Sequence, residues 1–317
     1  MSSLGSGRPG VSWRIWLQGT AGPRRWAADT IFGLGAAVVG RLLHDRNRLL
    51  AICKWLVAIG RSADAVTIAD LARRDSPYDG KLYLHLAEAA ITGGDRARVE
   101  GLIDRLAVGR EGISRSAALL LEVIGTIEAP RGYEVIFRNR QDQLATPLTA
   151  MTLAEVLAAQ PGWATTNGSS AAGRYQVIDR TLATLSVDLA LDPLARYDAS
   201  LQDRIGYGLL LRRGFDRFIS RDLPLPDFAL ELAREWAAFP VVAPVEGMHR
   251  QLEAGETYYA GDGRNRALMS PPLFVAILER CLALAPDAGN SRPAALASAG
   301  KIGDAAAAGL GSLTPSE

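Results

Sequence analysis

Cysteine and histidine are scarce in this sequence. The chain of 317 residues contains two cysteines, Cys53 and Cys281, and three histidines, His44, His85 and His249. Two cysteines in different halves of a chain do not form a disulfide framework, and a free cysteine usually behaves as a small buried hydrophobe. The histidines lack the spacing of metal ligands. The sequence therefore predicts two core thiols, no metal site and no cofactor.

Several other signatures are also missing. No Walker-type phosphate loop, GxGxxG fingerprint or GxSxG elbow is present. The formal net charge of +1 gives no basic footprint for nucleic acid. The apolar stretch Thr30–Gly40 is shorter than the about 20 residues that span a bilayer, and it lies later than a typical signal core. We expect no nucleic-acid partner, no stable membrane span and no clear signal peptide.

The hydrophobic fraction and the periodicity of the sequence indicate a folded, helix-rich chain. Its hydrophobic fraction of 48% is enough for a sizeable core. Helical patterns fill residues 26–108, and a joint follows at Gly109–Gly112. We expect a mainly α fold, in which an N-terminal helical module precedes an α+β domain with a small β element. The predicted parts are a flexible terminus at 1–25, the module at 26–110, the second domain at 111–285, and a mobile Ala/Gly/Ser-rich tail at 286–317.

One glutamate stands out at the end of a predicted helix. The helix runs from Ser114 to Ile127, and Glu128 continues its apolar stripe four residues after Ile124. Burial and the helix dipole both disfavour a negative charge there, so both should raise the pKa of the carboxyl. A carboxyl that keeps its proton near neutral pH suits general acid catalysis. The alternative is a glutamate that turns into solvent or pairs with Arg131.

The segments after Glu128 are predicted from shorter patterns. Tyr133–Phe137 suggests a strand, and Thr152–Gln160 suggests a short helix followed by a Gly/Ser/Thr-rich loop through Ser169. From Ala171 a further helix is expected, with Tyr175 on its apolar face. Three later helices are marked by apolar stripes: Leu201, Ile205 and Leu209; Phe228, Leu232, Trp236 and Phe239; and Phe274, Ile277, Leu278 and Cys281.

Two ordered motifs give the sequence a resemblance to a known family. Gly132–Ile136 reads G-Y-E-V-I directly after Glu128, and Ser169–Gln176 reads S-S-A-A-G-R-Y-Q. Together they resemble the phage lambda-type endolysins, the lysozyme-like glycoside hydrolase family 104. The likeness extends from about Ile113 to Leu282. It includes the pair Gln202-Asp203, the pair Arg213-Gly214, and W-A-A-F-P at Trp236–Pro240.

The resemblance implies an activity and a set of site residues. It makes Glu128 the single acid and base of a lytic transglycosylase that cuts the glycan strands of peptidoglycan and leaves 1,6-anhydro-muramic acid ends. An internal hydroxyl nucleophile needs no ordered water. A hydrolysing lysozyme would need a second carboxylate, for which Glu134 and Asp142 are the candidates. The substrate-binding residues that we expect around the acid are Tyr133, Gly173, Arg174, Tyr175, Gln176 and Tyr259.

A non-enzymatic role is the main competing hypothesis. The domain could be a structural or glycan-binding part of a phage particle, although a pure binder has no need for a buried acid. Residues 26–110 carry no recognisable catalytic residue, so we expect them to dock on the catalytic domain or on a phage structural or secretion-apparatus protein. The site of action is expected to be the bacterial cell wall in the periplasm, reached by phage release or within the particle. A fragment that begins at Gly109 is expected to fold and act alone.

Overall fold

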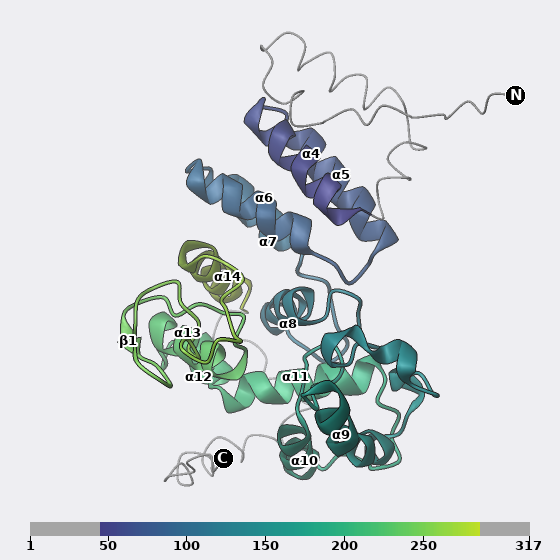
Figure 1. Cartoon of the computed structure of the whole chain (residues 1–317). Helices are drawn as coiled ribbons and strands as arrows, with labels where there is room; N and C mark the ends of the chain where they lie inside the picture. The colour runs from purple at the N-terminus through teal and green to yellow at the C-terminus, as the bar shows by residue number, and fades with distance from the viewer. Residues whose placement is uncertain (1–44, 286–317) are drawn as a thin grey trace, which may run out of the picture. The chain divides into compact units, whose positions relative to one another are not determined.

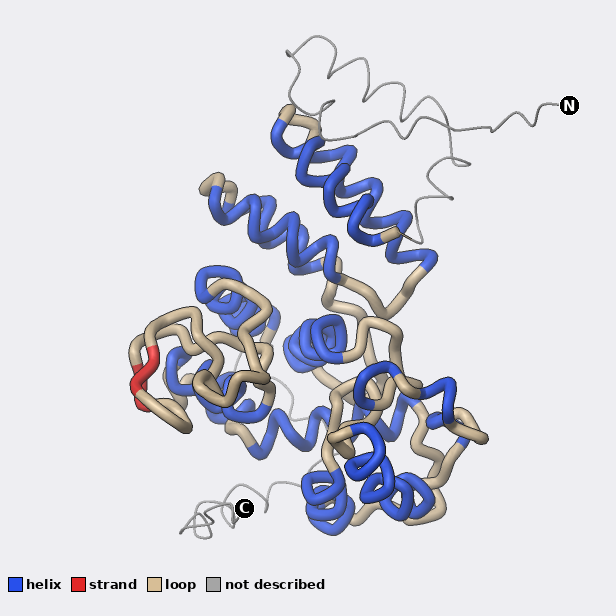
Figure 2. The backbone as a smooth tube through the Cα atoms, in the orientation of Figure 1, coloured by secondary structure: helices blue, strands red, loops and turns tan. Residues whose placement is uncertain are grey.

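The computed structural model describes residues 45–285 of the chain. The predicted flexible terminus, the apolar stretch Thr30–Gly40 and the predicted tail at 286–317 lie outside the described residues. Within them, eleven α-helices and one two-stranded antiparallel sheet form the regular structure (Figure 2). The prediction of a mainly α-helical fold with a small β element is therefore confirmed. No helix between residues 45 and 285 is both long and apolar enough to cross a membrane.

The described residues divide into two compact units between Asp75 and Ser76, so that residues 45–75 belong to the first unit and residues 76–285 to the second. In the first unit, α4 (Arg46–Ala58) and α5 (Ser62–Asp75) form a helical hairpin (Figure 1). The connection between them contains Gly60 at φ 79°, a left-handed conformation that glycine adopts without strain. Apolar side chains of both helices are buried: Leu49, Cys53, Leu56, Ala65, Ile68 and Ala69.

The second unit begins with another hairpin, α6 (Lys81–Thr92) and α7 (Arg96–Asp104). Gly94 turns the chain at φ 70°, and the Asp95 side chain caps α7 by accepting a hydrogen bond from the Arg98 backbone N–H. The apolar side chains of α7 and of the turn after it are buried: Val99, Leu102, Ile103 and Leu106.

This hairpin belongs to the same unit as the predicted catalytic domain. Both helices pack on α14 (Pro271–Leu284), and the Arg280 guanidinium binds the Asp104 carboxylate at 2.7 and 2.6 Å. The expected joint is also held in place, because Arg110 donates to the Ala118 carbonyl at 2.9 Å. A fragment that starts at Ser76 would keep these contacts, whereas one that starts at Gly109 would expose the face of α14 that α6 and α7 cover.

Helix α8 (Arg115–Glu128) runs through the middle of the second unit, between α11 and α14 (Figure 1). Ser114 caps its first turn by accepting a hydrogen bond from the Ala117 N–H at 3.3 Å. The helix is predicted correctly, but its apolar stripe is not distinctive, since every residue from 116 to 127 is buried. One of those buried residues is Glu122, a charged side chain in the core.

The remaining helices complete the unit around α8. Two stacked ring pairs join them, Phe218 with Phe228 at 4.4 Å between centroids and Phe239 with Phe274 at 4.5 Å. The small sheet pairs β1 (Val245–Glu246) with β2 (Gln251–Leu252). The other helices are α9 (Leu153–Asn167), α10 (Asp179–Asp188), α11 (Ala199–Arg212), α12 (Phe215–Ile219) and α13 (Leu225–Glu235).

The predicted end of the helix that starts after Thr152 is wrong. Helix α9 does not end at Gln160 but continues past Pro161 to Asn167, where Gly168 ends it at φ 86°. Pro161 lacks only one donor and is exposed, and the hydroxyls of Thr165 and Thr166 donate to carbonyls one turn earlier, as helical Thr side chains can. The supposed Gly/Ser/Thr-rich loop is therefore mostly helix.

The segment after Ala171 is a turn and not the start of a helix. Ala172 makes isolated bridges with Ile136 and with Val177, and α10 begins at Asp179. Gly173 at φ 77° and Gln176 at φ 50° adopt left-handed conformations that a right-handed helix excludes. The expected strand at 133–137 is reduced to the single bridge at Ile136, because a 3-10 turn follows at Phe137–Asn139.

Candidate functional site

Glu128 is the last residue of α8, and its side chain is half-buried. The helix ends because Ala129 leaves helical geometry, with φ −139° and ψ 69°. Burial raises the pKa of the Glu128 carboxyl to about 7, against a smaller lowering by the positive charge of Lys81. Among the described residues no hydrogen bond or ion pair engages the carboxyl, so the alternative pairing with Arg131 is not formed. A free, poorly solvated carboxyl of this kind can donate a proton near neutral pH.

The Arg174 side chain binds the C-terminal end of α8. Its buried guanidinium donates to the carbonyl oxygens of Gly125 at 3.1 Å and Ala129 at 2.9 Å, which also accept from the backbone N–H groups of Ala129 and Gly132. A Cβ on Gly125 would lie 2.3 Å from the Arg174 Nε, so the close approach requires glycine there. Arg174, expected to bind substrate, is thus directed into the protein and fixes the helix turn that carries Glu128.

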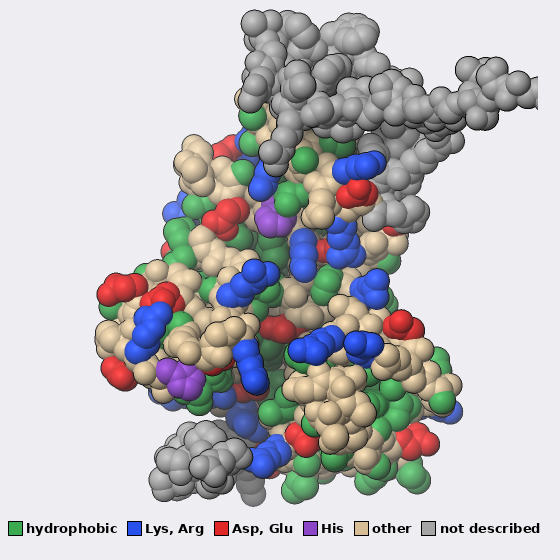
Figure 3. Space-filling model, in the orientation of Figure 1, with side chains coloured by type: hydrophobic (Ala, Val, Ile, Leu, Met, Phe, Trp, Pro, Cys, Tyr) green, Lys and Arg blue, Asp and Glu red, His purple; other side chains and the backbone are tan. Residues whose placement is uncertain are grey.

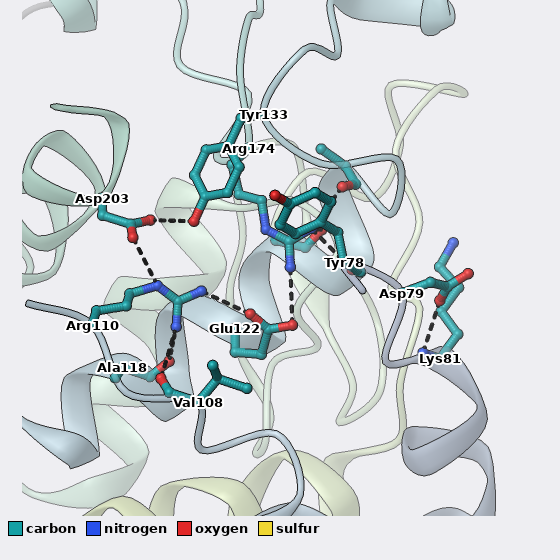
Figure 4. A network of polar contacts seen from close by, with 12 residues as sticks. Tyr78, Asp79, Lys81, Val108, Arg110, Ala118, Glu122, Tyr133, Arg174 and Asp203 are labelled. Carbon is teal, nitrogen blue, oxygen red and sulfur yellow. Dashed lines mark hydrogen bonds and ion pairs between the residues drawn. The ribbon is translucent and has the colours of Figure 1, made fainter. Parts of the chain in front are cut away.

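A buried ionic network surrounds that arginine (Figure 4). Glu122 accepts from Arg174 at 3.0 Å and from Arg110 at 2.7 Å. Arg110 also pairs with Asp203, its Nε lying 3.1 Å from the carboxylate Oδ2. Two arginines therefore balance two carboxylates in the core, the arrangement that buried charges require.

Two expected substrate residues donate to the same network. The hydroxyls of Tyr133 and Tyr175 both bind Asp203 Oδ1, the first at 2.8 Å. Burial, with the nearby charge of Asp203, raises the pKa of Tyr133 to about 12, so the phenol stays protonated and can donate. Tyr175 is fully buried. Both tyrosine hydroxyls are therefore used in holding the network together.

The side-chain amide of Gln202, one of the Gln202-Asp203 pair, holds the A-A-G-R-Y-Q turn in place. Gln202 accepts from the Arg174 backbone N–H at 2.8 Å and donates to the Tyr133 carbonyl at 3.1 Å. A Cβ on Gly173 would lie 2.4 Å from the Gln202 Oε1. Gln176 donates to the Gly173 carbonyl at 2.8 Å and keeps a half-buried side chain. Gly173 thus serves close packing, and Gln176 remains partly available to a ligand.

The remaining predicted site residues, Glu134, Asp142 and Tyr259, make no contact with the Glu128 carboxyl through a hydrogen bond or ion pair among the described residues. Glu134 accepts hydrogen bonds from the backbone N–H and the hydroxyl of Thr149, and Asp142 is exposed in a 3-10 turn. The Tyr259 hydroxyl donates to the Arg234 carbonyl at the end of α13. No hydrogen bond or ion pair among the described residues joins any of these three side chains to Glu128. None of them completes a site with the acid through direct contact.

The sequence analysis missed the segment at 78–81, which lies against the end of α8. The Tyr78 carbonyl accepts from Arg174 at 3.0 Å, and the Tyr78 ring meets the Tyr133 ring edge-on at 5.4 Å. A Cβ on Gly132 would lie 2.4 Å from the Tyr78 ring. Glu122 was also missed, although a lone charge in an apolar helical run is a visible signal of a buried ion pair.

The surface over α8 is hollowed in Figure 3, with an acidic side chain at the floor of the hollow and arginine or lysine side chains on either side. No group of three or more metal-ligating side chains occurs within residues 45–285. Comparison with models of known families, with curated proteins and with solved structures gives no significant match. The site residues and the sequence motifs are therefore the features of this chain that indicate a function.

Proposed function

We propose that the protein is a peptidoglycan-cleaving lytic transglycosylase with a lysozyme-like catalytic domain and Glu128 as its acid and base. The observation that carries the proposal is the Glu128 carboxyl, which is half-buried, has no hydrogen-bond partner among the described residues and has a pKa raised to about 7. The motifs around it, G-Y-E-V-I and A-A-G-R-Y-Q, support the same assignment. The Ile136–Ala172 bridge joins them in space.

The proposed reaction uses the one carboxyl twice. Protonated Glu128 gives its proton to the oxygen between N-acetylmuramic acid and N-acetylglucosamine, and the bond from that oxygen to the muramic acid C1 breaks. The C6 hydroxyl oxygen of the same muramic acid then bonds to C1, and its proton passes to the Glu128 carboxylate. The ring closure returns the acid to its starting form. It is favoured by the high effective concentration of an internal nucleophile.

The products distinguish this mechanism from hydrolysis. We expect 1,6-anhydro-muramic acid ends, because hydrolysis needs a second carboxylate held close to the acid. Glu134 is bound to Thr149 and Asp142 is exposed, and no hydrogen bond holds either carboxylate next to Glu128. Mass spectrometry of muropeptides released from purified sacculi measures the outcome. Products heavier by one water, with reducing ends, would mean a hydrolase and would direct attention to Glu134 and Asp142.

The pH dependence follows from the raised pKa. The free enzyme needs protonated Glu128, and this form is lost as the pH rises through about 7. We therefore expect kcat/KM to be constant below about pH 6 and to fall about tenfold for each pH unit above 8, as for any single required acid. Initial rates of glycan release between pH 5 and pH 9 measure the profile. An Asp142→Asn variant should give the same profile, and a rate that rises from pH 7 to pH 9 would contradict the assignment.

A structural or glycan-binding role without catalysis is the second outcome of these assays. It would appear as binding to sacculi with no release of soluble fragments. In the periplasm, the proposed enzyme would act on the cell wall after phage release or from within a particle. Under this proposal, the first unit provides docking to a phage structural or secretion-apparatus protein.

A further inference from the structure

Lys81 and Glu128 are ionisable side chains near each other that form no ion pair. The positive charge of Lys81 acts on the Glu128 carboxyl, yet no ion pair joins them. The Lys81 ammonium has no hydrogen-bond or ion-pair partner among residues 45–285; only its backbone N–H is engaged, by Asp79 at 3.0 Å. Neither the ammonium nor the carboxyl is therefore engaged by another side chain of residues 45–285.

The other nearby charges are already compensated. Glu122 is balanced by two arginines, and Asp203 pairs with Arg110. The Asp79 carboxylate turns toward the first turn of α6, where a helix N-terminus favours negative charge. Glu128 carries at most part of a negative charge near neutral pH. The half-buried Lys81 and the exposed Arg131 are thus both cations near the end of α8 that have no counter-ion among residues 45–285.

The segment that carries Lys81 is fixed in place. Arg174 binds the Tyr78 carbonyl and the Ala129 carbonyl with the same nitrogen, at 3.0 and 2.9 Å, so it ties the start of α6 to the end of α8 (Figure 4). The Tyr78 ring packs on Gly132 and on the Tyr133 ring. The backbone just before Lys81 is therefore held close to the end of α8 by contacts of Tyr78.

We propose that Lys81 binds a carboxylate of the substrate beside the glycosidic oxygen that Glu128 protonates. The inference rests on the proposed function, because it takes the ligand to be a glycan strand whose muramic acid residues bear lactyl carboxyl groups. Its chemical class is an acidic saccharide. A charge-assisted hydrogen bond to a carboxylate is among the stronger polar contacts, and its loss weakens binding by about tenfold or more.

The test measures binding, not turnover, in the full-length Glu128→Gln protein. Glutamine removes the titrating carboxyl, so Lys81 cannot act through the ionisation of Glu128. The probes are fluorescently labelled glycan strands stripped of peptides, which carry free lactyl carboxylates, and the same strands with those carboxylates converted to methylamides. The additional variants are Lys81→Met, Lys81→Arg and, as a matched control, Lys54→Met at an exposed lysine of α4.

We expect Lys81→Met to weaken binding of the acidic strands by about tenfold and to change binding of the amidated strands less than twofold. Lys81→Arg should restore most of the preference, and Lys54→Met should leave both affinities unchanged. Equal weakening of both strands, or no weakening of either, would overturn the inference. Cleavage by the parent protein is a separate measurement. The proposed function can therefore fail while the charge preference is still observed, and the reverse can also occur.

Discussion

Replacing Arg174 by methionine should destabilise the second unit by about 3–5 kcal/mol, the usual cost of removing one partner of a buried ion pair. The change removes one of the arginines that form an ion pair with the buried Glu122 carboxylate. It also removes one hydrogen-bond donor from each of the Gly125, Ala129 and Tyr78 carbonyls. Urea denaturation of the full-length chain, followed by tryptophan fluorescence, measures the loss.

The matched control is Arg180→Met, which changes an exposed arginine on α10. We expect it to shift the free energy of unfolding by no more than about 0.5 kcal/mol, as exposed substitutions usually do. The double variant Glu122→Met/Arg174→Met should lose less than the sum of the two single changes, since it leaves no unpaired charge at that contact. If Arg174→Met shifts stability no more than Arg180→Met, the network does not hold α8 in place.

The sequence predicts those parts of the fold that local chemistry determines. Ser114, Asp95 and Ser270 each precede a helix and cap it through a side-chain oxygen. Apolar spacing identifies α8 and α14, because both helices bury their apolar positions. Those signals lie within one or two helical turns, so they are readable without the tertiary structure.

Contacts between segments that are far apart in the sequence cannot be predicted from local patterns. Glu122 is recognisable as a charge in an apolar run, but its partners Arg110 and Arg174 lie 12 and 52 residues away along the chain. The motif A-A-G-R-Y-Q looks helical by spacing, yet Gly173 and Gln176 bend it into a turn that Gln202 holds. Tertiary packing decides both features.

The acid itself is partly predictable. Its place at the end of an apolar helix correctly indicates a poorly solvated carboxyl, and burial raises its pKa to about 7. The stripe alone does not distinguish it, because α8 is buried on all sides. The neighbouring residues at 78–81 were not predictable. The α6–α7 hairpin separates them from α8 in the sequence, and Tyr78 reaches the end of α8 through tertiary contacts with Arg174, Gly132 and Tyr133.

Replacing Glu128 by glutamine should reduce glycan cleavage by about 10²- to 10⁴-fold, the contribution of general acid catalysis. Glutamine keeps the shape of the protonated acid but has no proton to give. The fold should be retained. Because the folded pKa lies above the unfolded value of 4.5, the stabilising effect of this group is present below about pH 4.5 and is lost as the pH rises to about 7. The glutamine variant should therefore be at least as stable as the parent at pH 8.

Two carboxylate controls accompany that variant. Glu134→Gln and Asp142→Asn remove the candidates for a second catalytic carboxylate. Asp142→Asn should leave cleavage within about twofold, because its side chain is exposed and contacts no part of the Glu128 site. Glu134→Gln should lower stability slightly through weaker hydrogen bonds to Thr149, without the loss of turnover expected for Glu128→Gln.

The central claim is that Glu128 is the proton donor of a glycan-cleaving enzyme, and one paired assay tests it most directly. Purified sacculi are incubated at pH 6 with the parent protein or with the Glu128→Gln variant, and soluble muropeptides are counted over time. We predict rapid release by the parent and release at least 100-fold slower by the folded variant, as loss of a general acid requires. Release by the variant within tenfold of the parent, or no release by the folded parent protein, would contradict the account.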